Sequence, residues 1–454
     1  MSRSAYFVGF LVGLAPCAAA LAQEVEQPAA EVLTLDAAIE QALQYNSDVQ
    51  IAGLRLGEVK AVRDKVTTAY LPNIVAAATY THNSAEAVFD MGKIIQGIGK
   101  NIGVPIAPES LPPPSYIQRF DTLGAVLTLD QPVFAMSPIL LMRAADRQID
   151  AQTAAQEATR REIIYQVKQV YYTLAGTERL IQSAQRALSL ADQRIANALR
   201  RQASGAEGEL TVLRAQTERD KAEQDLIRTQ NVRQQLLAAI GTLLGADPPT
   251  AVSPPPALEL PAGDAQAWVQ SSMRQRPDLE ARRQAVAAAQ VALEEAQLRW
   301  LPILSIGGRL NYTDTAGFAG KNWLWAVTAN LAVPLFDRGL RYADARERRQ
   351  TQARLNAELS KAQTELKTAL RQTELDLRTA EKTLAIALAQ AQKAKRMAEI
   401  VGKAQVAGAA TSLEVAEADT GLRVAESAAE RERINLQLAM LKLQHLTGAV
   451  TASK

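Results

Sequence analysis

The sequence is built twice on one plan, and this duplication constrains the fold more than any other feature. Tyr70-Leu71-Pro72 recurs as Trp300-Leu301-Pro302, and Gly205-Ala206 recurs as Gly408-Ala409. Two further landmarks keep the same order, because 131–134 resembles 333–336 and 244–246 resembles 447–449. Between the two copies, residues 247–261 are rich in proline, which blocks regular helix and internal strand. We therefore expect a first repeat at 23–246, a linker at 247–261 and a second repeat at 262–454.

Each repeat ends in two helical stretches that are too long for a compact globule. They cover 138–200 and 208–244 in the first repeat, and 338–402 and 411–446 in the second. At ~1.5 Å per residue, the helix over 138–200 would extend about 95 Å. Within 338–402, leucines 370, 377 and 384 recur every seven residues, which predicts coiled-coil packing. Only 5% of the residues are aromatic, which fits small-residue seams better than a bulky core. Shorter helices are expected over 35–69 and 264–298.

Four segments of about ten residues alternate polar and apolar side chains with the two-residue period of a β-strand. They predict two hairpins, at 73–130 and 303–333, with strands of the length that a tilted membrane strand needs, ~9–11 residues. The polar positions, which we expect to face a pore lumen, are Thr122, Thr128, Asp130, Ser305, Arg309, Asn311, Thr328 and Asn330. Tyr312, Trp323 and Trp325 lie among the apolar positions and suit a membrane interface.

The alternation has two readings. A soluble antiparallel sheet that packs one face on a core would show the same pattern, and periodicity alone leaves that reading open. In lipid, four strands cannot close a barrel, for which about eight are needed. Copies of the chain would then share the barrel, and a trimer supplying twelve strands is the geometric hypothesis. The loop at 81–119 makes the first hairpin much the longer one, and we expect either a lid over the pore mouth or a surface insertion there.

The remaining composition excludes several functions. Residues 1–22 carry Arg3, an apolar run and Ala20-Leu21-Ala22, which predicts a cleaved signal peptide, while lipidation at Cys17 is the alternative. The chain has 50 basic and 48 acidic residues, a balance that gives no positive electrostatic field for binding nucleic acid. His82 and His445 have no second His or Cys at ligand spacing, so we expect no metal site, no cofactor and no catalytic triad.

Several motifs, taken in order and doubled, resemble those of the TolC-like outer-membrane efflux proteins. The resemblance covers essentially the whole mature chain. Its carriers are Leu33-Thr34-Leu35-Asp36-Ala37-Ala38, Arg276-Pro277-Asp278-Leu279, Trp300-Leu301-Pro302, Val333-Pro334-Leu335-Phe336-Asp337-Arg338-Gly339 and Gly408-Ala409-Ala410-Thr411-Ser412-Leu413-Glu414-Val415.

The resemblance implies a mainly α fold with a small transmembrane β part, in which a homotrimer forms a twelve-stranded barrel in outer-membrane lipid. A coiled-coil helical tunnel would continue the barrel into the periplasm and meet a periplasmic adaptor (membrane fusion) protein and an inner-membrane transporter. The chain would passively conduct the substrates of a tripartite efflux system and would perform no chemistry, so it would not be an enzyme. Type I polypeptide secretion is the alternative, since the pump chooses the substrate, and a periplasmic coiled-coil protein without a pore is a second one.

The resemblance also implies roles for residues near the helical tips. Gly205 and Gly408 would form the two tip turns, and Leu210 and Leu413 occupy matching positions that we expect to dock the adaptor. Glu399 lies where family members carry acids that constrict the tunnel entrance. The family often places a tyrosine three residues before the tip glycine, where this chain has Gln202 and Gln405.

Overall fold

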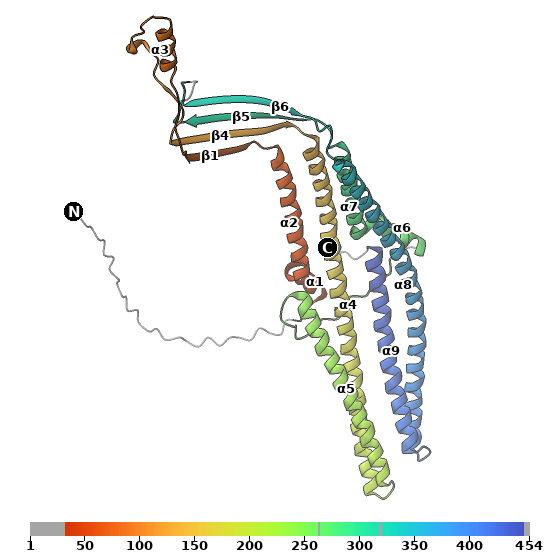
Figure 1. The fold of residues 1–454 in the computed structure, drawn as a ribbon. Helices are drawn as coiled ribbons and strands as arrows, with labels where there is room; N and C mark the ends of the chain where they lie inside the picture. Colours follow the sequence, from red (N-terminus) through yellow and green to blue (C-terminus); the bar gives the residue numbers. More distant parts are fainter. Residues whose placement is uncertain (1–31, 262–263, 317–319, 449–454) are drawn as a thin grey trace, which may run out of the picture.

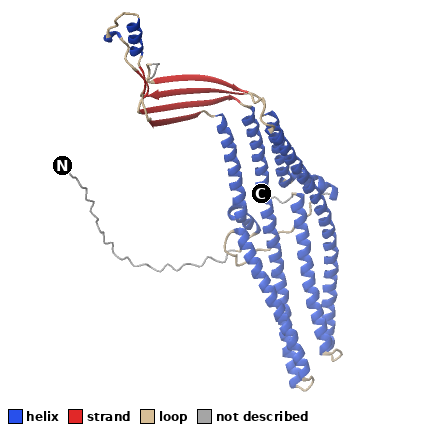
Figure 2. Cartoon of the chain, viewed as in Figure 1, coloured by secondary structure: helices blue, strands red, loops and turns tan. Residues whose placement is uncertain are grey.

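The structure is a computed structural model that describes residues 32–261, 264–316 and 320–448. The predicted signal peptide at 1–22 and Cys17 lie outside the described residues. One sheet lies at one end of the molecule, and long helices extend from it (Figures 1 and 2). The first repeat contains α1 (Leu35–Tyr45), α2 (Ser47–Thr67), β1 (Asn73–His82), β4 (Asp121–Phe134), α4 (Met136–Ala203) and α5 (Glu209–Leu244). The second contains α6 (Ala265–Gln275), α7 (Pro277–Leu298), β5 (Ile303–Thr313), β6 (Trp323–Ala332), α8 (Leu340–Val406) and α9 (Ser412–Thr447).

The first helix of each repeat is broken, whereas the sequence predicts single helices over 35–69 and 264–298. Asn46 separates α1 from α2: its backbone is extended, and its side-chain oxygen accepts a hydrogen bond from the Asp48 N–H at 2.9 Å. Arg276 separates α6 from α7, because the following Pro277 disfavours helical geometry in the residue before it. Each break is therefore a local effect of capping or of proline.

The long helices pack as two hairpins, α4 with α5 and α8 with α9. The predicted seven-residue seam of α8 is buried at Leu370, Thr373, Leu377, Ala380 and Ala387. A separate hydrophobic core lies where α1, α4 and α5 pack together, and it contains two buried tyrosines of α4, Tyr171 and Tyr172. The Tyr171 hydroxyl lies 2.9 Å from the Ser253 carbonyl oxygen, and the Tyr172 hydroxyl donates to the Pro256 carbonyl at 2.8 Å. These contacts hold the proline-rich linker against the middle of α4.

The sheet is antiparallel with the order β1-β4-β5-β6, so that β1 and β6 are its edges. Neither edge has a partner strand among the described residues. Strand β6 leads into α8 through Asp337, whose carboxylate accepts hydrogen bonds from the N–H groups of Gly339 and Arg341. Of the helices that are described, none is long and apolar enough to cross a membrane.

The long loop of the first hairpin contains structure that the sequence analysis does not anticipate. A short ribbon of β2 (Ala87–Phe89) and β3 (Ser115–Gln118) continues the hairpin, and the helix α3 (Met91–Asn101) follows β2. The Asp90 side chain caps α3 by accepting a hydrogen bond from the Lys93 N–H at 2.9 Å. This insertion stands beyond the ends of the sheet strands (Figure 1).

Candidate functional site

One face of the sheet carries the polar residues that the sequence assigns to a lumen. Residues directly opposite each other in an antiparallel pair point to the same face. Thr128 lies opposite Arg309, and Ser305 lies opposite Asn330. Gly307 lies between Asp130 and Thr328 in the same row. Alternation along the strands adds Thr122 and Asn311, so that the register brings all the assigned residues together on one face.

The opposite face is apolar and exposed. Tyr312 lies opposite Trp323, with ring centroids 4.8 Å apart, and Leu310 lies opposite Trp325. Tyr80 extends this aromatic group on β1, and the sequence analysis did not single it out. An exposed face with this many apolar side chains needs a non-aqueous neighbour. The sheet thus separates a polar side from an apolar side, as the wall of a membrane pore must.

The two helical hairpins end in similar turns. Gly205 and Gly408 both have positive φ angles, 73° and 77°, which glycine adopts without steric cost. Leu210 and Leu413 lie in the first turns of α5 and α9, and both side chains are exposed. The structure therefore places these four residues at one end of the molecule, as the sequence analysis expects.

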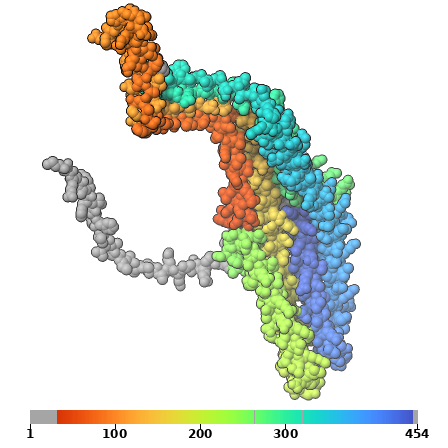
Figure 3. Space-filling view, viewed as in Figure 1, coloured from red at the N-terminus to blue at the C-terminus, as the bar shows by residue number. Residues whose placement is uncertain are grey.

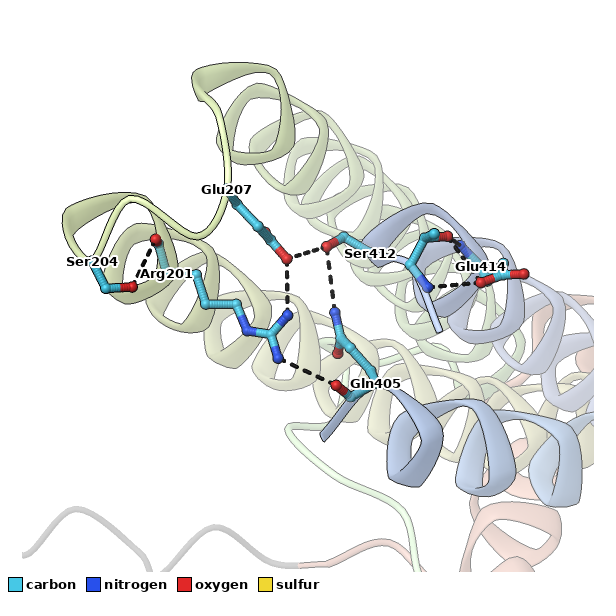
Figure 4. A network of polar contacts seen from close by, with 7 residues as sticks. Arg201, Ser204, Glu207, Gln405, Ser412 and Glu414 are labelled. Carbon is cyan, nitrogen blue, oxygen red and sulfur yellow. Dashed lines mark hydrogen bonds and ion pairs between the residues drawn. The ribbon is translucent and has the colours of Figure 1, made fainter. Parts of the chain in front are cut away.

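A polar network joins the two tips (Figure 4). The Glu207 carboxylate accepts hydrogen bonds from the Arg201 guanidinium at 2.9 Å and from the Ser412 hydroxyl. Arg201 also donates to the Gln405 carbonyl at 3.4 Å, and the Gln405 side-chain amide lies 3.4 Å from the Ser412 oxygen. The sequence analysis missed Arg201, Glu207 and Ser412, because nothing in their spacing reveals that distant segments meet. Glu399 lies on the exposed surface of α8, and no described residue forms an ion pair with it.

A cavity of about 660 Å³ lies between the hairpins directly behind this network. Arg194 binds Asp419 through two hydrogen bonds of 2.8 and 3.3 Å across the cavity wall. Its lining also includes Arg186, Arg214 and Lys395, which form no ion pair with any described residue. The cavity is consequently lined by more free cations than free anions.

Neither histidine belongs to a chemical site. His445 stacks on Tyr165, with ring centroids 4.4 Å apart, and its Nε2 atom lies 3.3 Å from the Glu162 carboxylate. Burial lowers the pKa of His445, and the nearby Glu162 charge opposes this shift. His82 is exposed and contacts Asp121 at 2.7 Å. Among the described residues, no three His, Cys, Asp or Glu side chains are grouped so that they could hold a metal ion.

Comparison with known proteins identifies the family to which the chain belongs. The sequence pattern of the outer membrane efflux proteins matches residues 38–246 and 268–449. The chain belongs to this family. Protein CyaE of Bordetella pertussis is 26% identical over 203 residues, a region that spans 43% of this chain and 43% of that relative.

Solved structures share the fold over nearly the full chain. The outer membrane protein VceC of Vibrio cholerae matches with a TM-score of 0.74 at 19% identity, covering 91% of this chain and 96% of its own. The outer membrane channel CmeC of Campylobacter jejuni matches with a TM-score of 0.73 at 17% identity, covering 91% and 85%. These comparisons confirm the mainly α fold with a two-fold repeat and a small membrane β part.

Family membership fixes the general role. The chain is an outer membrane efflux protein, a transport protein and not an enzyme. The alternative of a periplasmic coiled-coil protein without a pore is therefore wrong. The same family membership also speaks against a soluble sheet with a core on one face.

Proposed function

We propose that three copies of the chain form the exit duct of a tripartite efflux system. The observation that carries this proposal is a four-stranded sheet whose two edge strands have no further partner among the described residues, and which has one polar face and one apolar face. Lipid offers no hydrogen bonds to an open strand edge. Pairing β6 of one copy with β1 of the next satisfies both edges, and three copies supply twelve strands, which exceeds the practical minimum of about eight.

The orientation of the barrel wall follows from its two faces. Trp323, Trp325 and Tyr312 would contact lipid near the outer rim, whereas Thr128, Arg309 and Asn330 would line the water-filled lumen. Asp130 and Arg309 carry opposite charges on the lumen side, so the wall has no uniform charge that would select one class of ion. Transport through this duct is passive, and the energy comes from an inner-membrane transporter.

The tips supply the adaptor-docking surface. Leu210 and Leu413 expose apolar side chains beside the turns at Gly205 and Gly408, where a periplasmic adaptor can bury them. The same end of the molecule carries Glu399, which three copies would bring toward a common axis. Its repeated negative charge would constrict the tunnel entrance.

The first experiment tests the pore. The purified chain is measured by native mass spectrometry and by single-channel recording in planar bilayers. We expect a mass of three chains and a steady ionic current. A monomeric protein that carries no current would refute the duct.

The second experiment tests the adaptor. The double variant Leu210→Glu/Leu413→Glu should lose its cross-link to the adaptor in cells. The control Leu54→Glu changes a leucine on α2 that is even more exposed than the two tip leucines but lies far from the tips, and it should keep the cross-link. Loss of export of small toxic compounds together with the cross-link would support efflux. Loss of polypeptide export instead would favour the secretion alternative.

A further inference from the structure

The insertion between β1 and β4 contains a helix that packs with its small residues inward. Gly92 and Gly99 of α3 are buried against the proline-rich segment that returns to β3. A Cβ atom at Gly99 would lie 2.9 Å from the Val104 carbonyl oxygen, and one at Gly92 would lie 3.1 Å from the Pro112 carbonyl oxygen. Any larger side chain would push the helix off this segment. The insertion therefore has a defined packing of its own.

The glycines and the half-buried Ile95 mark the inward side of α3, whereas the other large apolar side chains of the helix and its C-cap face outward. Met91, Ile94, Ile98 and Ile102 recur every three or four residues and form one stripe, the α3 stripe. These side chains are 42%, 47%, 55% and 67% exposed. Most helices at a protein surface bury such a stripe against their own fold. An exposed stripe of this length indicates a partner that the single chain does not contain.

Lipid does not fit as that partner. Tyr80, Tyr312 and Trp323 mark the outer rim of the apolar face, and the ribbon of β2 and β3 rises beyond it (Figures 1 and 3). The seven residue steps from His82 to Phe89 can span up to about 23 Å at ~3.3 Å per residue, which is enough to place α3 outside the hydrocarbon region. Lys93 is paired with Asp90 at 3.3 Å, and the insertion carries as many acids as bases. It therefore offers no surplus of positive charge to lipid phosphates.

A second copy of the chain does fit. The insertion is attached to β1, which is an edge of the sheet and therefore the seam between neighbouring copies in the proposed trimer. The hairpin of β5 and β6 lacks such an insertion, since its strands are joined by the short segment 314–322. In the part of this loop that the structure describes, the neighbouring copy therefore has no helix or strand above its own β6. A balanced charge also permits identical insertions to approach one another closely.

We propose that the α3 stripe of each copy packs on the insertion of the next copy, so that three insertions form a ring above the outer mouth of the channel. This inference rests on the proposed trimer. A head-to-tail contact between identical subunits closes into a ring when the rotation per copy matches the symmetry. The ring narrows the exit, and it must loosen for large substrates to leave.

Site-specific photo-crosslinking in the full chain tests the contact. A benzophenone amino acid replaces Ile98 in the α3 stripe, and in a matched control it replaces Gln96, which is also exposed on α3. The proteins are irradiated in intact outer membranes and separated in denaturing gels. If the contact forms, the Ile98 probe gives covalent products with the mass of two and three chains, and the Gln96 probe gives none of these products.

A second variant tests the constriction. Ile94→Asn/Ile98→Asn removes the apolar contact without touching the packed glycine side, and we expect a higher single-channel conductance than that of the unchanged chain. The inference is overturned if the Ile98 probe yields no chain-to-chain product, or lipid adducts alone, from a protein that is trimeric by native mass. A protein that is not trimeric would instead refute the proposed function itself, so the two failures are distinguishable.

Discussion

A buried carboxylate at the joint below the sheet offers the sharpest test of how this chain is held together. Glu295, in the last turn of α7, is 2% exposed. Its carboxylate accepts hydrogen bonds from Arg299 Nε at 3.2 Å and Nη2 at 2.9 Å, and from the Ser137 hydroxyl in the first turn of α4. Arg299 also binds Asp344 in α8. Glu295 therefore joins α7 to α4 directly and to α8 through Arg299, where these three helices adjoin the strands.

The cost of Glu295→Ala follows from these contacts. Removing one partner of a buried pair costs ~3–5 kcal/mol, because the other charge is left unpaired. Here the cost is lower, since Arg299 keeps Asp344 and is 38% exposed, so that solvent screens the charge left behind. Losing the acceptor for the Ser137 hydroxyl adds about 1 kcal/mol. We expect a loss of about 2–3 kcal/mol in the free energy of unfolding, and about 1–2 kcal/mol for Glu295→Gln, which keeps the shape and one hydrogen bond.

Chemical unfolding of the purified protein, followed by far-UV circular dichroism, measures both values. The neighbouring Glu294→Ala is the matched control, because Glu294 is only partly buried and its carboxylate accepts a single hydrogen bond, a long one of 3.4 Å from Gln290. We expect the control to change the free energy of unfolding by less than about 0.5 kcal/mol. If Glu295→Ala is as mild as the control, the joint does not depend on this carboxylate and the reasoning is wrong.

Three further variants test other contacts. Burial lowers the pKa of His445, so the folded state binds fewer protons than the unfolded state, and the free energy of unfolding should fall as the pH drops through the ordinary pKa of about 6.5. His445→Phe keeps the stack on Tyr165 and should flatten this dependence when unfolding is measured as a function of pH. Gly176→Ala should destabilise by about 1–3 kcal/mol, because its Cβ would overlap Ile434 Cγ1, and Ile434→Ala should restore part of the loss in thermal melts. Thr411→Ala removes the capping box of α9 and should cost about 1 kcal/mol, seen as faster hydrogen exchange in its first turn.

The long helices could be predicted because their signal repeats many times. The seam of α8 carries Leu370 and Leu377 at a constant spacing, so that a single irregular residue does not hide it. The breaks at Asn46 and Arg276 depend on one residue each. Pro277 could have revealed the second break. The first required knowing that the Asn46 amide donates to the Leu243 carbonyl at 2.9 Å, a contact between segments far apart in the sequence.

The insertion and the tip network escaped prediction for different reasons. In α3 the apolar residues have helical spacing, but Gly92 and Gly99 and the nearby prolines suggest a loop, and only packing shows that the glycines are the buried side. At the tips, Glu207 and Ser412 come from different repeats. Their meeting depends on how the two hairpins lie side by side, which no local pattern encodes.

The two hairpins are held together differently along their length. High on the molecule, Gly176 of α4 lets Ile434 of α9 approach closely, and this contact is apolar and tight. An ion pair of Arg179 with Glu430 accompanies it. Toward the tips the links between the hairpins are polar, as in the ion pair of Arg194 with Asp419 and the hydrogen bond from the Ser412 hydroxyl to Glu207. Ion pairs near the surface contribute about 1 kcal/mol or less each, and salt weakens them. Salt does not weaken tight apolar packing. We therefore expect the hairpins to separate at the tips at a lower free-energy cost than at the level of Gly176.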